Sequence, residues 1–160
     1  MILLGVDPGL ANTGWGIIDS QANRHRALDF GSITTPPAWA AGDRLKFIYE
    51  KLEEVVDKFK PLEAGIETLF FVKNITSALP VAQARGVVIL LLAQKGLIIA
   101  EYGPNQIKSA LVGAGKAEKS QVQEMVKLLL GLTTIPKPNH AADALAAAVC
   151  HAHHRGGYRV

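Results

Sequence analysis

The chain has 160 residues, 49% of them hydrophobic and 19% charged, which fits one folded domain over residues 1–160 and excludes an intrinsically disordered protein. A single cysteine excludes an internal disulfide, and because we find no secretory signal and no uninterrupted run of 18 apolar residues, we expect a cytoplasmic protein with no membrane partner. The net charge of +3 is uneven: residues 1–80 carry −2 (8 basic, 10 acidic) and residues 81–160 carry +5 (9 basic, 4 acidic), which indicates either a polyanionic partner or ordinary solubilising lysines.

The first part of the chain predicts three strands in a meander, over residues 1–6, 15–18 and 27–33. The first strand ends at Asp7-Pro8-Gly9, a turn in which proline fixes φ and glycine permits a positive φ. A short turn at residues 20–23 joins the next two strands, and such short connections predict antiparallel pairing.

The rest of the chain predicts helices separated by two short strands. An apolar period of 3.6 residues starts at Asp43 and stops before Pro61, and Thr76 or Ser77 is a suitable N-cap for the next helix. The helices are expected over residues 43–60, 74–94, 105–111, 118–130 and 140–153, and the strands over residues 63–67 and 97–102. A strand reached through a helical crossover runs parallel to the first, so the order predicts an α/β fold with a mixed five-stranded sheet flanked by helices.

Two carboxylates stand where predicted strands end. Asp7 follows the strand over residues 1–6, and Glu67 closes the strand over residues 63–67. If these strands are parallel neighbours, both side chains lie at the edge of the sheet where α/β folds bind ligands. Taken singly, Asp7 could equally be a turn residue before proline, and Glu67 a solvated acid at a strand end.

His140 and Asp143 lie three residues apart at the start of the last predicted helix, so they share a helix face. Taken singly, Asp143 could be a first-turn acid that the helix dipole favours, and His140 a surface residue. Together with Asp7 and Glu67, however, they form a cluster whose three acids would repel one another without a cation. Clusters of this kind suit Mg²⁺ or Mn²⁺ and two-metal phosphoryl chemistry.

Five segments, in order over essentially the whole chain, carry a resemblance to a known family. They are GVDPG at residues 5–9, IETLF at 66–70, QARG at 83–86, AEKSQV at 117–122 and HAADAL at 140–145. In these segments the chain closely resembles the RuvC family of bacterial Holliday-junction resolvases. The resemblance implies a ribonuclease H-like fold.

The same resemblance implies an activity, a cofactor and partners. RuvC proteins work as homodimers on four-way DNA junctions, alongside the branch-migration complex RuvA–RuvB. They use divalent metal to nick two opposing strands in recombination and DNA repair, and here we expect Mg²⁺ or Mn²⁺, with two ions in each active site. The nicks carry 5′-phosphate and 3′-hydroxyl ends.

Carried over by motif, the resemblance implies that Asp7, Glu67 and Asp143 are catalytic acids and metal ligands. His140 stands where many relatives carry another aspartate, and some members have histidine there. The resemblance therefore implies a fourth catalytic residue and ligand, whose imidazole nitrogen shifts the metal preference toward Mn²⁺.

Residues for DNA binding are also implied. Lys108 and Lys119 match family lysines near the scissile phosphate, where a compact positive charge offsets phosphorane charge, so Lys119 is also a catalytic candidate. Phe70 matches the aromatic residue that stacks on unpaired bases at the junction centre; Phe71 could substitute for it, and Phe70 could instead be a core residue. Further candidates for contacts to the DNA backbone, without a strong motif, are Lys73, Lys116, Arg85 and Lys137, each of which could equally be a solvated surface residue.

Two other function classes stay open. Asp7-Pro8-Gly9 followed by Thr13-Gly14 also resembles the phosphate-binding hairpin of actin-like ATP-binding domains, although that architecture needs a second lobe for which 160 residues leave no room. The third class is a non-catalytic junction-binding module, for which Asp7→Asn would leave binding and every other activity unchanged.

Overall fold

The computed structural model describes residues 1–69 and 74–155. Within these residues the chain forms a five-stranded sheet, in the order β3-β2-β1-β4-β5, and five helices. The strands are β1 (Ile2–Asp7), β2 (Asn12–Gln21), β3 (Arg24–Thr34), β4 (Glu63–Glu67) and β5 (Ile98–Tyr102). The helices are α1 (Ala41–Phe59), α2 (Ile75–Gln94), α3 (Pro104–Val112), α4 (Lys119–Leu129) and α5 (Asn139–His154).

The sheet is mixed, as the sequence predicts. β1, β2 and β3 pair antiparallel, whereas β4 lies parallel to both β1 and β5. β2 and β3 extend beyond the predicted ranges 15–18 and 27–33, because their polar ends continue the ladder as far as the pair Gln21 and Arg24. Backbone hydrogen bonds along a hairpin do not require apolar side chains, so apolar patterning underestimates such strands.

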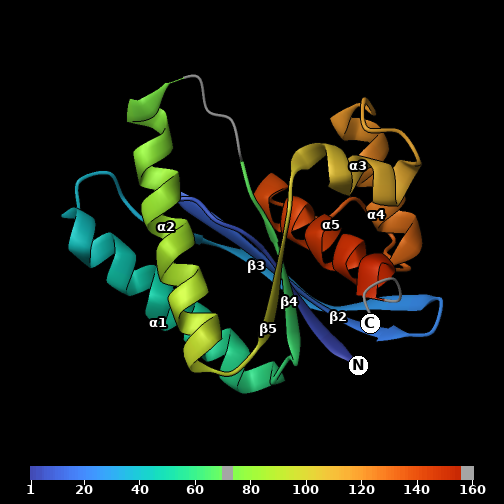
Figure 1. Cartoon of the computed structure of the whole chain (residues 1–160), viewed down its shortest axis with the longest axis horizontal. Coiled ribbons are helices and arrows are strands. Elements are labelled where there is room, and N and C mark those ends of the chain that lie inside the picture. The colour runs from blue at the N-terminus through green and yellow to red at the C-terminus, as the bar shows by residue number, and fades with distance from the viewer. Residues whose placement is uncertain (70–73, 156–160) are drawn as a thin grey trace.

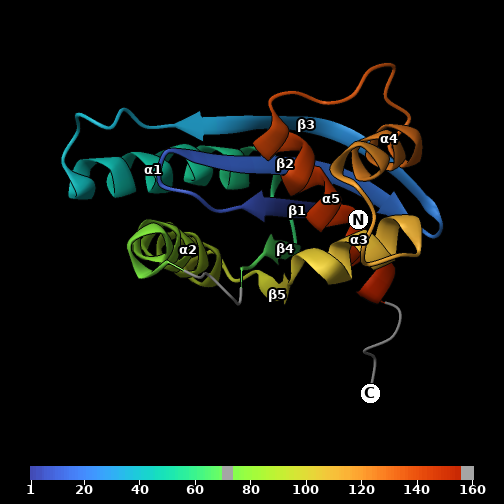
Figure 2. The same ribbon diagram turned by 90° about the horizontal axis from the view of Figure 1, so that it is seen from above.

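Helices cover both faces of the sheet and enclose two apolar cores (Figures 1 and 2). α1 and α2 lie on one face, where Ile48 and Leu52 of α1 pack with Val88 and Leu91 of α2. α5 lies on the other face, and α3 and α4 pack against it. Cys150 is fully buried in this second core, as expected of a packing residue.

Glycines let α5 lie directly against the sheet. A Cβ atom at Gly5 would lie 1.8 Å from the carbonyl oxygen of Ala144, and one at Gly14 would lie 1.9 Å from the carbonyl oxygen of His140. No other residue type could occupy these positions without moving the α5 backbone. The position of the start of α5, which carries His140 and Asp143, is therefore set by β1 and β2.

α2 differs from the sequence expectation in its cap and in its apolar length. Its N-cap is Asn74, whose side-chain oxygen accepts the Thr76 N–H at 3.0 Å, not Thr76 or Ser77. In the part of the chain that the structure describes, α2 is the one helix long and apolar enough to cross a membrane by length and composition. Polar residues interrupt its first half, so its longest continuous apolar run is the stretch of residues 87–93. Its buried residues, Ala84, Val88, Leu91 and Leu92, pack into the core.

Candidate active site

The strand ends and the start of α5 meet at one edge of the sheet. β1 and β4 are parallel neighbours with Val6 opposite Ile66, so the next residues, Asp7 and Glu67, leave the sheet at the same level. α5 starts above this edge because the glycines of β1 and β2 seat it there. Asp7 and His140, which are 133 positions apart in the chain, thereby come into contact.

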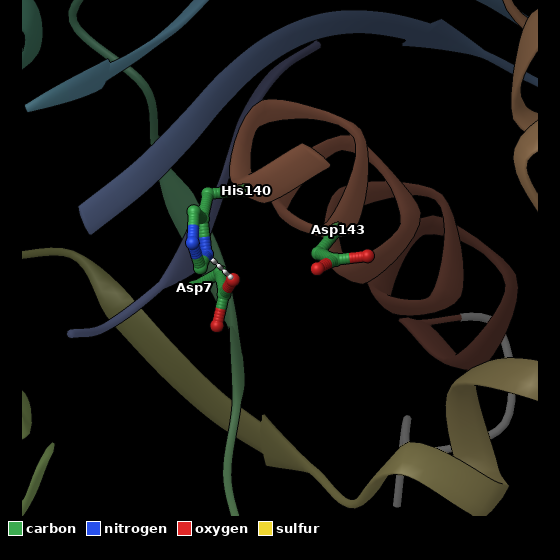
Figure 3. A group of neighbouring side chains, drawn as sticks. All are labelled: Asp7, His140 and Asp143. Carbon is green, nitrogen blue, oxygen red and sulfur yellow. Dashed lines mark hydrogen bonds and ion pairs between the residues drawn. The ribbon is translucent and has the colours of Figure 1, made fainter. Parts of the chain in front are cut away.

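Asp7, His140 and Asp143 form a compact group at this edge (Figure 3). Each offers one ligand atom, and these atoms lie within 4.8 Å of one another. His140 Nδ1 lies 3.0 Å from Asp7 Oδ2, while Asp143 faces them from the next turn of α5. Asp7 is the most enclosed of the three side chains, with 18% of its surface exposed, against 25% for Asp143 and 45% for His140.

Glu67 lies beside this group and is coupled to it electrostatically. Burial, followed by the charges of Asp7 and Asp143, raises the pKa of Glu67 from 4.5 to about 8. Burial also raises the pKa of Asp7, although the hydrogen bond with His140 opposes that shift. Both shifts have the same cause: negative charges are crowded where water is scarce, with too little positive charge nearby.

The donor set fits a hard divalent cation. Carboxylate oxygens are the ligands that Mg²⁺ and Mn²⁺ prefer, and an imidazole nitrogen is tolerated better by Mn²⁺. A cation would also relieve the repulsion that raises the pKa of Glu67. The group of Asp7, His140 and Asp143 could therefore hold a metal ion. Glu67 lies close enough to this group to interact electrostatically with such an ion.

Two hollows open on either side of the acids. One, with a volume of about 500 Å³, is lined by Asp7, Glu67, His140 and residues of α2. The other, of about 200 Å³, is lined by Glu67, Asp143 and two lysines, Lys108 of α3 and Lys119 of α4. Lys119 Nζ lies 3.2 Å from Asp143 Oδ2 and keeps 58% of its side chain exposed, so it can reach a bound phosphate.

The turn that presents Asp7 is tied by a threonine that the sequence analysis did not assign to the site. Thr13 Oγ1 donates to the Gly9 carbonyl oxygen at 2.6 Å and accepts the Gly9 N–H at 3.3 Å. Thr13 is fully buried, so its hydroxyl is used inside the turn. This argues against the actin-like alternative, in which the hairpin would offer its polar groups to a phosphate.

Other predicted DNA contacts have different outcomes. Phe70, Phe71 and Lys73 lie outside the described residues. Arg85 was a candidate contact to the DNA backbone, and one edge of its guanidinium group engages Glu101, at 2.6 Å from Nε and 2.8 Å from Nη2. The side chain keeps 39% of its surface exposed, and its contact with the DNA backbone stays a prediction. The Glu101 partner was missed because 16 residues separate the two side chains.

Comparison with known proteins places the chain in a family. A model of the family described as "Crossover junction endodeoxyribonuclease RuvC" matches residues 3–151. The chain belongs to the RuvC family. It is 57% identical to the RuvC of Treponema denticola over 147 residues, which cover 92% of this chain and 83% of that protein. It is 52% identical to the RuvC of Alkaliphilus oremlandii, with coverage of 96% and 93%.

Solved structures confirm the predicted fold class. RuvC of T. thermophilus in complex with a Holliday junction substrate superposes with a TM-score of 0.93 at 36% identity, covering 97% of this chain and 94% of that one. The Fowlpox virus resolvase, solved with Holliday junction DNA, has a TM-score of 0.61 at 11% identity, over 93% and 97% of the two chains. At that identity the viral enzyme shares the fold alone. The RuvC match extends to sequence as well.

Proposed function

We propose that this RuvC protein resolves Holliday junctions, acting as one nuclease domain over residues 1–160 that nicks two opposing strands symmetrically. The observation that carries the proposal is the cluster of Asp7, His140 and Asp143, with Glu67 and Lys119 beside it. The cluster occurs in a chain 57% identical to a crossover junction endodeoxyribonuclease. Its role is DNA recombination and repair.

In this proposal Asp7, Glu67 and Asp143 bind divalent metal, and His140 completes the ligand set and favours Mn²⁺ over Mg²⁺. The chemistry that two such ions supply when bound is a lower pKa for the attacking water and neutralised charge on the leaving oxygen. In-line attack with departure of the 3′ oxygen leaves 5′-phosphate and 3′-hydroxyl ends.

Lysines and one aromatic residue complete the DNA-binding surface that we propose. Lys119 offsets charge on the pentacovalent phosphate, and Lys108 borders the same hollow from α3. Lys73 binds the DNA backbone, and Phe70 stacks on unpaired bases at the junction centre.

We also propose that the protein is a homodimer formed through α2. Ile75, Leu79 and Leu90 are 76%, 58% and 54% exposed, and their spacing puts them on one stripe of the helix, away from its buried face. A second copy of α2 would cover this stripe and pair two active sites. The partner complex, from the family resemblance, is RuvA–RuvB in the cytoplasm.

A nicking assay tests the central proposal. A synthetic four-way junction with labelled arms is incubated with the protein and either Mg²⁺ or Mn²⁺, and the products are treated with ligase. We expect paired, symmetric nicks that the ligase seals, and no comparable cleavage of a linear duplex. Absence of paired nicks with both metals would refute the resolvase assignment.

Lys119→Ala should slow cleavage by roughly 10²-fold, in the range for loss of one group that stabilises transition-state charge. Single-turnover kinetics on a saturating junction measure this directly. Lys127→Ala is the matched control, because Lys127 also lies on α4 but pairs with Glu124 and not with Asp143. A Lys119→Ala rate equal to that of the unsubstituted protein would contradict a catalytic role.

Metal should stabilise the fold more at pH 8 than at pH 6. The raised pKa of Glu67, about 8 against 4.5, means that the folded chain holds a proton that the unfolded chain has lost in this interval. Stability contributed by this group is therefore present below pH 4.5 and is lost as the pH rises toward 8.

Because Mn²⁺ competes with the proton on Glu67, we expect a larger Mn²⁺-induced rise in Tm at pH 8. Differential scanning fluorimetry measures it. Equal Mn²⁺-induced rises in Tm at both pH values would contradict the assignment of Glu67 as a metal ligand. The same pH dependence in Glu67→Gln would contradict it as well.

Leu90→Glu should convert the protein to monomers, because it places a charge on the exposed stripe of α2. The products should then be junctions with single nicks and not with two symmetric nicks. Light scattering coupled to size-exclusion chromatography reports the mass. Leu128→Glu serves as the control, since Leu128 of α4 is 72% exposed and lies outside α2. An unchanged dimer mass for Leu90→Glu would rule out this interface.

A further inference from the structure

A polar network lies behind Glu67, outside the acid cluster, and joins three elements. Glu101 of β5 accepts two hydrogen bonds from Arg85 of α2, at 2.6 Å from Nε and 2.8 Å from Nη2. The same carboxylate accepts a third, from Thr68 Oγ1, at 3.1 Å. Thr68 directly follows Glu67, so the network is one residue away from the site.

Thr68 is fixed by its backbone as well as by its side chain. Its N–H donates to the carbonyl oxygen of Tyr102 at 2.9 Å, which continues the parallel pairing one residue beyond the end of β4. The residue is buried, with 6% of its surface exposed. Successive side chains of an extended chain point to opposite faces, so Thr68 faces the α2 side while Glu67 faces the α5 side. Holding Thr68 therefore fixes the direction of Glu67.

Glu67 needs such a restraint because its neighbours push it away. Asp7 and Asp143 carry charges of the same sign, and within residues 1–69 and 74–155 no hydrogen bond or ion pair of the Glu67 side chain holds it against them; Lys119 and Lys108 act on it only at longer range. Arg85 neutralises Glu101, so the anchoring carboxylate adds no uncompensated charge behind the site. Loss of a group that orients a metal ligand typically lowers metal affinity by about 10- to 100-fold.

We propose that Glu101 is a positioning residue of the active site: with Arg85 as its counter-ion, it holds Thr68 and thereby aims Glu67 at the group of Asp7, His140 and Asp143. The inference deepens the proposed nuclease function and rests on it for the role of the metal. It also gives Arg85 a role, as the counter-ion of Glu101.

Mn²⁺ titration of the DNA-free protein by calorimetry tests the proposal. Thr68→Val removes the hydroxyl at nearly constant volume, and Glu101→Gln removes the charge. Both should weaken Mn²⁺ binding by about tenfold, the lower end for loss of a group that orients a ligand. Thr68→Ser keeps the donor and should restore affinity to within about twofold of the unsubstituted protein, a recovery that tracks the hydroxyl and not the packing volume.

Lys95→Met is the matched control, because it breaks the ion pairs with Glu53 and Asp57 at the other end of α2 and should leave Mn²⁺ affinity unchanged. If Thr68→Val and Glu101→Gln bind Mn²⁺ as tightly as the unsubstituted protein, or if Lys95→Met weakens binding as much, the proposal is overturned. If Glu101→Gln fails to fold, the comparison of Thr68→Val with Thr68→Ser decides alone. An unsubstituted protein that binds Mn²⁺ but nicks no junction refutes the nuclease function, while the titration still decides the role of Glu101.

Discussion

Asp7→Asn should abolish junction cleavage and leave junction binding intact. The substitution keeps the size of the side chain but removes a charge from the centre of the ligand group, where Asp7 is the most enclosed member. The neutral amide of asparagine also binds a divalent cation more weakly than the carboxylate of aspartate does. We expect the single-turnover rate to fall by about 10³-fold or more, at or above the upper end for one electrostatic group.

Two measurements on the same preparation check this result: nicking in Mn²⁺, and junction affinity in Ca²⁺ by gel shift. Asp43→Asn is the control, because Asp43 is an exposed acid in the first turn of α1, remote from the ligand group. It should match the unsubstituted protein in both measurements. A nicking rate for Asp7→Asn within tenfold of the unsubstituted protein would remove Asp7 from the chemistry. Binding by both proteins with nicking by neither would instead favour the non-catalytic junction-binding module.

The sheet topology was predictable because local patterns determine it. A short turn between apolar runs requires antiparallel pairing, and a helical crossover requires parallel pairing. The limits of β2 and β3 were missed because Asn12 and Arg24 extend the ladder through backbone groups that carry no sequence signal. The N-cap of α2 was placed too late because Asn74, Thr76 and Ser77 are all competent caps, and only the bond from the Thr76 N–H to Asn74 decides between them.

The site, like the fold, contains features that could be predicted from the sequence and features that could not. Asp7 and Glu67 could be placed together from the sequence, because the ends of parallel strands meet at one edge. The bond between Thr68 and Glu101 could not be placed, since it joins side chains 33 residues apart whose facing depends on the register of β4 with β5. The role of Gly14 was also hidden, because a glycine next to a threonine after a turn does not reveal which helix will lie above it.

Gly14→Ala should displace the first turn of α5 and destroy the metal site. The new methyl group would lie 1.9 Å from the carbonyl oxygen of His140 and 2.3 Å from its carbonyl carbon, and both are backbone atoms that cannot rotate away. Overpacking of this kind costs about 3 kcal/mol when the surroundings relax only partly. The shift falls on the residue that carries a proposed ligand, so we expect loss of Mn²⁺ binding and of nicking in addition to a lower free energy of unfolding.

Chemical denaturation measures the loss of stability, and Mn²⁺ calorimetry and the nicking assay measure the loss of the metal site. The last two are carried out without denaturant, under conditions in which the variant is still folded. Gly42→Ala is the matched control: nothing lies within 4 Å of a Cβ atom there, and alanine favours the helical conformation over glycine. That variant should be as stable as the unsubstituted protein or more stable, with full activity. If Gly14→Ala were equally tolerated, α5 would have room to move away from the sheet, and the ligand geometry could not depend on the close contact of His140 with β2.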